Sequence, residues 1–134
     1  MESLWPQFEQ LALSVPYKIL QEQVDLFNSQ MAGMLICSLE TDHTVKSYIV
    51  LNHYDSSAKM YVSSPRLQEY RLLLVQVDYA LAKAYPCEVY NCVDENQNFG
   101  RTANNPEEFK SILKEIFHSK EVVSSLQNIM AQTL

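Results

Sequence analysis

Glycine is scarce in this sequence, with only Gly33 and Gly100 among 134 residues. The phosphate-binding loops of P-loop proteins and of dinucleotide-binding domains need several glycines close together, because the backbone must turn tightly and approach the phosphates. Two distant glycines cannot build either loop. The sequence therefore excludes both nucleotide-binding motifs, and we expect no cofactor.

Histidine and cysteine are also few. His43, His53 and His118 stand far apart, and none of them forms the HxxxH, HExxH or Cys/His spacing that gathers metal ligands. Cys87 and Cys92 lie in one predicted strand with an odd spacing, so their side chains point to opposite faces. We expect no metal site, and reduced thiols rather than a disulfide or a redox pair.

Long apolar runs and a basic N-terminal region are missing as well. The longest apolar runs, such as 31–37 and 72–75, are far shorter than the roughly 18 residues that cross a bilayer. Residues 1–15 contain no Lys or Arg, whereas a secretory signal begins with a basic region. The net charge of −6 repels phosphate backbones and anionic lipids. We expect a cytoplasmic protein that binds neither nucleic acid nor membranes.

The sequence does contain enough apolar material for one core. Hydrophobic residues make up 47% of the chain and are spread along its whole length, with no polar low-complexity tract. A chain of this size buries roughly two thirds of the surface that its unfolded form exposes. We therefore predict a single domain over residues 1–134.

Helices are predicted at both ends of the chain. At the N-terminus the spacing of apolar residues predicts a short first helix within 1–15, and then a second one that begins near Pro16 with Ser14 as its N-cap. Near the C-terminus, Asn105 supplies a cap, Pro106 the first helical position, and two glutamates follow. A last helix after His118 and Ser119 uses an apolar stripe of Val122, Leu126, Ile129 and Met130.

Strands are predicted between these helices. Ile, Val, Leu and Tyr are frequent in 34–40, 45–54 and 59–63, and polar turns separate the three segments, which predicts a three-strand antiparallel meander. A later strand is predicted over 86–93. Residues 65–84 keep helical spacing after Ser64 and Pro65, and this favours a central helix. A buried strand over 70–77 remains the competing interpretation, because 72–75 is a continuous apolar run.

The predicted fold class is therefore α+β, with an antiparallel sheet of at least four strands packed against N-terminal, central and C-terminal helices. This order of elements, with the small size and the acidic charge, resembles the fold of type III secretion chaperones. That resemblance is topological and rests on no motif. It implies a dimeric binding protein.

Alternation along the strands sorts their side chains into two faces. If residue 40 lies opposite 45 and residue 54 opposite 59, one face is apolar and faces the core; it collects Met34, Ile36, Ile49, Leu51, His53, Met60 and Val62. The other face is amphipathic; it collects Leu35, Cys37, Leu39, Lys46, Tyr48, Val50, Asn52, Tyr54, Lys59 and Tyr61, and the later strand adds Glu88, Tyr90 and Cys92.

Tyrosine offers a large contact area and a polar tip, so it is enriched where proteins recognise one another. The candidate binding residues on the amphipathic face are Tyr48, Asn52, Tyr54, Tyr61 and Tyr90. Two interpretations stay open: a helix covers this face, or the face binds a second copy, another protein or a ligand.

No pattern assigns catalysis. His53 is the one histidine placed on a strand face, and its predicted neighbour is Met60 rather than a nucleophile. Glu107 and Glu108 are explained by the helix start. We therefore predict a non-enzymatic protein-binding module that forms a homodimer and binds another protein. The alternative is a small-molecule pocket between the sheet and its helices, to which His53 would contribute a polar group.

Overall fold

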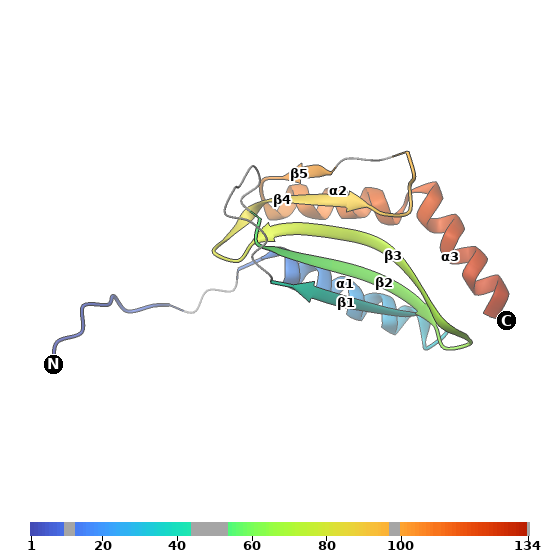
Figure 1. Cartoon of the computed structure of the whole chain (residues 1–134), viewed down its shortest axis with the longest axis horizontal. Coiled ribbons are helices and arrows are strands. Elements are labelled where there is room, and N and C mark those ends of the chain that lie inside the picture. The colour runs from blue at the N-terminus through green and yellow to red at the C-terminus, as the bar shows by residue number, and fades with distance from the viewer. Residues whose placement is uncertain (10–12, 44–53, 97–99, 134) are drawn as a thin grey trace.

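The computed structural model describes residues 1–9, 13–43, 54–96 and 100–133. This part of the chain folds into an antiparallel five-stranded sheet with three helices, so the predicted α+β class is confirmed (Figure 1). The strands follow one another across the sheet in the order β1-β2-β3-β4-β5. The elements are α1 (Pro16–Met31), β1 (Ile36–Asp42), β2 (Ser56–Ser64), β3 (Leu67–Ala80), β4 (Lys83–Asn91), β5 (Arg101–Ala103), α2 (Pro106–Phe117) and α3 (Lys120–Thr133).

Both C-terminal helices form where the sequence predicts them. The Asn105 side chain accepts a hydrogen bond of 2.8 Å from the backbone N–H of Glu108, and Pro106 occupies the first turn of α2. The amide oxygen thus satisfies one of the N–H groups that a helix start leaves unpaired. The buried stripe of α2 consists of Phe109, Ile112, Leu113 and Ile116.

The N-terminal helix α1 begins at Pro16 as predicted, but Ser14 does not cap it. The N-cap is Val15, which makes no side-chain capping bond. The backbone carbonyl of Ser14 instead accepts a hydrogen bond of 2.7 Å from the Tyr85 hydroxyl on β4. The start of α1 is therefore tied to the sheet, and Pro16 alone supplies the local start signal.

The predicted short first helix is wrong for the part of 1–15 that the structure describes. Residues 1–9 and 13–15 contain no helix, and residues 1–9 run away from the body as an extended arm (Figure 1). Isolated short helices are marginal in water unless an apolar face packs on something. Leu4 and Phe8 have no core to pack against, and Pro6 interrupts the segment.

The predicted central helix is also wrong. Residues 67–80 form strand β3, and Ser64 to Leu67 make the turn of the β2–β3 hairpin rather than a helix start. Val75 and Val77 are buried while Gln76 and Asp78 point to the other side, which is the alternation of a strand. The competing strand interpretation of 70–77 is confirmed. The resemblance to the secretion chaperones is weakened, because it included a helix over 65–84.

The predicted strand pairing is corrected in the same way. β1 pairs with β2, so that Lys59 stands between Glu40 on one side and Gln76 on the other. The sequence pattern predicts Lys59 opposite Tyr54, which is wrong because Glu40 and Gln76 occupy the two sides of Lys59. The predicted pair of Glu40 and Val45 involves a residue outside the described ranges. The predicted strand 45–54 falls, except for Tyr54, outside the described residues.

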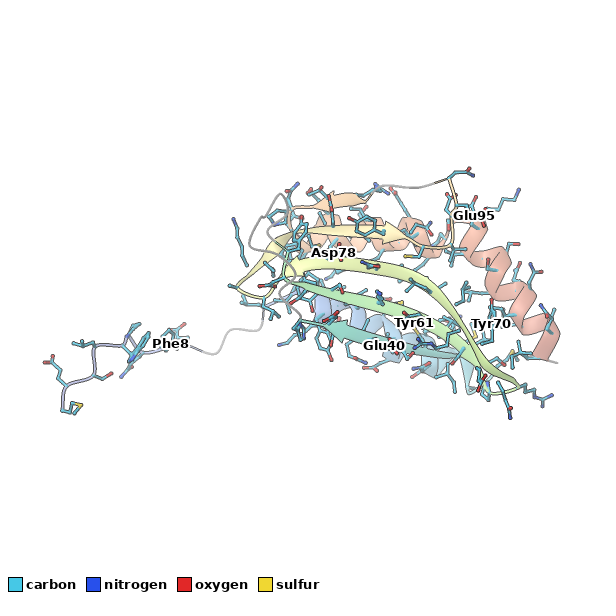
Figure 2. The ribbon with its side chains drawn as sticks, in the orientation of Figure 1. Phe8, Glu40, Tyr61, Tyr70, Asp78 and Glu95 are labelled. Carbon is cyan, nitrogen blue, oxygen red and sulfur yellow. The ribbon has the colours of Figure 1, made fainter. Side chains whose placement is uncertain are left out.

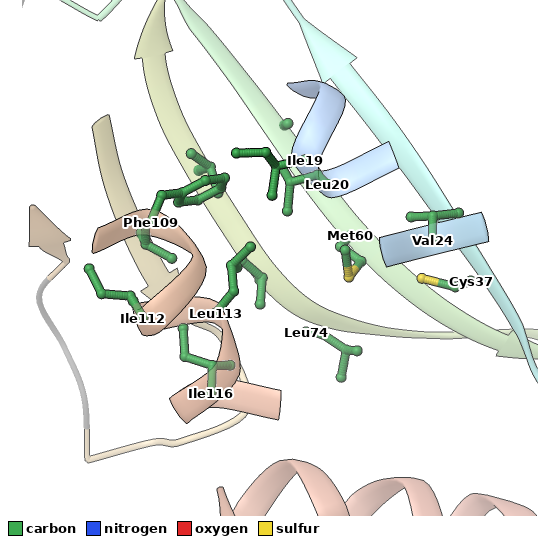
Figure 3. Packing of buried hydrophobic residues seen from close by; sticks show 14 of the residues in the cluster. Ile19, Leu20, Val24, Cys37, Met60, Leu74, Phe109, Ile112, Leu113 and Ile116 are labelled. Carbon is green, nitrogen blue, oxygen red and sulfur yellow. The ribbon is translucent and has the colours of Figure 1, made fainter. Parts of the chain in front are cut away.

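The core lies between the sheet and helices α1 and α2, which cover the same face (Figures 1 and 3). Met60 and Val62 point into this core, as predicted. For β1 the predicted faces are reversed, because Leu35 and Cys37 are buried, whereas Ile36 is 42% exposed. The cause is the pairing: Cys37 lies opposite Val62 and therefore shares its face.

The Asn28 side chain fixes this orientation of β1. Its Nδ2 donates to the Cys37 carbonyl at 2.9 Å, and its Oδ1 accepts from the Cys37 backbone N–H at 2.7 Å. The two bonds copy a strand ladder and attach the last turns of α1 to β1.

Candidate functional site

The face of the sheet opposite α1 and α2 carries no helix in the described part of the chain, and we call it the open face (Figure 2). Antiparallel sheets commonly leave one face to the solvent. The open face consists of Ile36, Ser38, Glu40, Asp42, Ser57, Lys59, Tyr61, Ser63, Arg71, Leu73, Gln76, Asp78, Glu88, Tyr90 and Thr102.

The guanidinium of Arg71 lies over the ring of Tyr61. Arg71 forms an ion pair with Glu40, and its guanidinium carbon lies 4.0 Å from the centre of the Tyr61 ring. A cation above an aromatic ring contributes about 0.5–1 kcal/mol at exposed sites. The contact spans β1, β2 and β3, so it orients the tyrosine on the open face.

Tyr90 is positioned at the other end of the open face. Its hydroxyl donates a hydrogen bond of 2.8 Å to Glu88 Oε2. A Cβ added to Gly100 would lie 2.9 Å from the Tyr90 ring, so the ring rests directly on the glycine backbone. Burial, followed by the bond to Glu88 and its charge, raises the pKa of Tyr90, which therefore keeps its proton as a donor.

Acidic residues gather beside Tyr90. In the row of residues that face each other across the strands, Asp42, Ser57, Asp78, Glu88 and Thr102 follow one another. Asp78 and Glu88 are directly opposite, and like charges in that position destabilise a sheet. Burial, followed by nearby charges that include those of Glu88 and Asp78, raises the pKa of Tyr54.

Three of the five predicted binding residues are therefore described, and all three are half-buried. Tyr61 and Tyr90 stand on the open face, and Tyr54 is close to Tyr90. Tyr48, Asn52 and the alternative pocket residue His53 lie outside the described residues. Tyr90 lies in the same cross-strand row as Lys59 and Gln76, and Tyr61 is the next residue after Lys59 on the open face of β2.

Sequence reasoning missed the residues that β3 contributes to the open face. Arg71, Gln76 and Asp78 belong to the segment that was predicted as a helix, so they were never placed beside the tyrosines. The signal that would have found them is the alternation of Val75, Val77 and Tyr79 with polar residues.

On the opposite, helix-covered side, a pocket of about 320 Å³ opens between α1, the α2–α3 junction and the sheet. We call it the groove. Its lining is mostly apolar, and it includes Leu26, Phe27, Met60, Leu74, Val122 and Leu126. His118 is the titratable side chain at its edge, and the His118 Nδ1 lies 2.8 Å from the Lys114 carbonyl, to which it donates. This groove lies where the alternative prediction placed a pocket, between the sheet and its helices.

The cysteines occupy different environments. Cys37 and Cys87 are buried, and burial raises the pKa of each thiol to about 12. Cys92 is exposed on the opposite side of β4 from Cys87. A thiol with so high a pKa carries almost no thiolate at neutral pH, so Cys37 and Cys87 act as apolar packing groups.

Within the described ranges, no cluster of three or more His, Cys, Asp or Glu side chains is arranged to hold a metal ion. None of the helices there is long and apolar enough to span a membrane. Comparison with protein-family models, with curated proteins and with solved structures found no match to the chain.

Proposed function

We propose that the chain is a small, non-enzymatic protein-binding module that forms a homodimer and binds a partner protein through its open face. The observation that carries this proposal is the combination of aromatic and acidic side chains on a sheet face that no described helix covers. Tyrosines held in place lose little conformational freedom on binding, which favours recognition.

The charges on the open face favour a partner with basic side chains. Asp78 and Glu88 repel each other across β3 and β4, and Tyr90 and Tyr54 stand next to them. An arriving Lys or Arg removes this repulsion and gains a contact with an aromatic ring at the same place. The partner is therefore a protein segment that presents at least one Lys or Arg between apolar side chains.

A second candidate function follows from the groove. Its volume of about 320 Å³ lies at the lower end of the range for small-molecule sites, and its lining is apolar with few polar groups. A small apolar ligand would occupy it. This function leaves the open face unused, so the two candidates involve opposite sides of the sheet.

Site-specific photocrosslinking in cells that express the protein tests the first candidate function, partner binding by the open face. We would place benzoylphenylalanine at Tyr90, and at Ser111 as the matched control, because Ser111 is exposed on α2 on the other side of the sheet. The expected result is a discrete crosslinked protein from position 90 that is absent from position 111. Asp78→Asn should reduce its yield. Equal crosslinking from both positions, or from neither, would contradict the proposal.

A further inference from the structure

Apart from Met1 at its end, the extended arm of residues 1–9 contains the three most exposed large apolar side chains of the described chain. Leu4 is 93% exposed, Trp5 78% and Phe8 76%. The rings of Trp5 and Phe8 lie 6.5 Å apart at an angle of 45°, so they contact each other rather than the body of the protein. Figure 2 shows Phe8 far from the sheet. Such a cluster in water is unfavourable and is typical of an interaction segment.

The groove offers the complementary surface. It is an apolar cavity large enough for aromatic side chains, and Leu26 at its edge is 62% exposed. Figure 3 shows Cys37, Met60 and Leu74 on the strands beneath, with Val24 on one side and Ile116 on the other. Within the described residues, the arm and the groove thus both present apolar side chains to the solvent.

We propose that the arm of one copy docks into the groove of a second copy, and that two copies exchange arms reciprocally. The inference rests on the proposed function in one respect, because it gives the mechanism of the homodimer. It assigns Trp5 and Phe8 as the anchoring side chains. The open face stays free for the partner protein.

Position argues for a second copy as the source of the arm. The arm leaves the body at the start of α1, where Ser14 is bonded to Tyr85, whereas the groove is lined by the second half of α1, from Gln23 to Met31. Figure 1 shows residues 1–9 running away from α1 and from α3. In this conformation the arm is presented to a neighbouring molecule.

The buried area also fits a dimer. Trp and Phe bury roughly 150–250 Å² each, so one arm contributes roughly 300–500 Å². Two exchanged arms then contribute roughly 600–1,000 Å² before the smaller area that they cover on the two grooves is added, which reaches the roughly 1,000 Å² that a specific interface needs. One arm folded onto its own groove would bury half of this area.

Trp5 is the only tryptophan in the chain, and its fluorescence therefore reports the position of the arm directly. We would record the emission maximum and the sedimentation equilibrium of the full chain over the same concentration series. The expected result is a dimer whose formation shifts the emission to shorter wavelength. Leu26→Glu, at the exposed edge of the groove, should give a folded monomer with long-wavelength emission, and Glu22→Gln on the exposed side of α1 should behave as wild type.

The variant Trp5→Ser/Phe8→Ser should weaken the dimer by at least about 30-fold, as removal of one aromatic hot spot does, and its circular dichroism should stay unchanged. For the wild-type chain, a dimer that keeps long-wavelength emission would overturn the exchange and leave the homodimer of the proposed function intact. A monomer with short-wavelength emission would show an arm in its own groove and overturn the exchange as well. A monomer with long-wavelength emission would overturn both.

Discussion

Successive residues of β2 meet two different environments. Ala58, Met60 and Val62 are buried under the helices, whereas Lys59 and Tyr61 are half-buried on the open face. The covered face is held by apolar packing, and the open face by charge pairs and aromatic contacts between neighbouring strands. One sheet therefore separates folding from recognition by the alternation of its side chains.

This difference predicts opposite consequences for substitutions on the two sides. Changes on the covered side should lower the free energy of unfolding by several kcal/mol, because they leave cavities or unpaired polar groups. Changes on the open face should alter stability by less than about 1 kcal/mol and act on binding.

The largest effect is expected for Phe109→Ala. Phe109 is fully buried and meets the ring of Tyr85 edge-on, with the ring centres 6.4 Å apart. Its truncation should lower the free energy of unfolding by about 3–5 kcal/mol in urea denaturation. Tyr70→Ala, at an exposed aromatic residue near the start of β3, is the matched control and should change it by about 0.5 kcal/mol or less. Similar losses in both variants would contradict the distinction between buried and exposed side chains.

Asn28→Ala should have the next largest effect. The variant leaves the buried N–H and C=O groups of Cys37 without their partner, so we expect a loss of about 2–3 kcal/mol. Hydrogen exchange of the Cys37 amide should accelerate at the same time. Gln21→Ala removes a side-chain bond on an exposed part of the same helix and should leave the stability nearly unchanged. Slow exchange at Cys37 in Asn28→Ala would show that this side chain does not anchor β1.

The buried thiols predict an alkaline limit to stability. Burial raises the pKa of Cys37 and Cys87 from 9.0 to about 12, so the folded state holds these protons more tightly than the unfolded state. The contribution of the two protonated thiols to the free energy of unfolding is complete below pH 9 and is lost as the pH rises from 9 towards 12. Urea denaturation at pH 8 and pH 10.5 should show a decline that is smaller in Cys37→Ala/Cys87→Ala. An equal decline in that variant would assign the limit to other groups.

The smallest effect is expected on the open face. Asp78→Asn removes the repulsion with Glu88, and it should raise the free energy of unfolding by about 0.2–1 kcal/mol. Thermal denaturation at low salt checks this, because salt screens the repulsion. Glu95→Gln, at an exposed residue beyond β4, is the charge-matched control and should have no such effect. A destabilised Asp78→Asn would indicate that the carboxylate has a structural role.

The sequence predicted those elements whose local signals agree with one another. At α2 the cap, the proline, the acids and the apolar stripe all indicate a helix starting at Asn105, and it forms there. Over 65–84 the signals conflict, because Leu67, Tyr70 and Leu74 have helical spacing while Val75 and Val77 alternate as in a strand. Pairing with β2 and β4 decided the outcome, and such long-range contacts leave no local trace.

Like the fold, the candidate site was predictable only in part. Tyr61 and Tyr90 were assigned to the correct face because the alternation of β2 and β4 was read correctly. Arg71 and Asp78 were missed together with β3, and the faces of β1 were reversed because its partner strand was misassigned. An error in the predicted strand pairing therefore changes which residues are assigned to each face of the sheet.

By this proposal, the open face binds a partner and does not hold the fold together. The most direct test compares the melting temperature of Tyr61→Ser/Tyr90→Ser with its crosslinking yield from benzoylphenylalanine at Lys59, which precedes Tyr61 on the open face of β2 and shares a cross-strand row with Tyr90. We predict a melting temperature within a few degrees of the wild type and loss of the crosslinked partner. A loss of about 3 kcal/mol or more of stability, or an unchanged crosslinking yield, would contradict it.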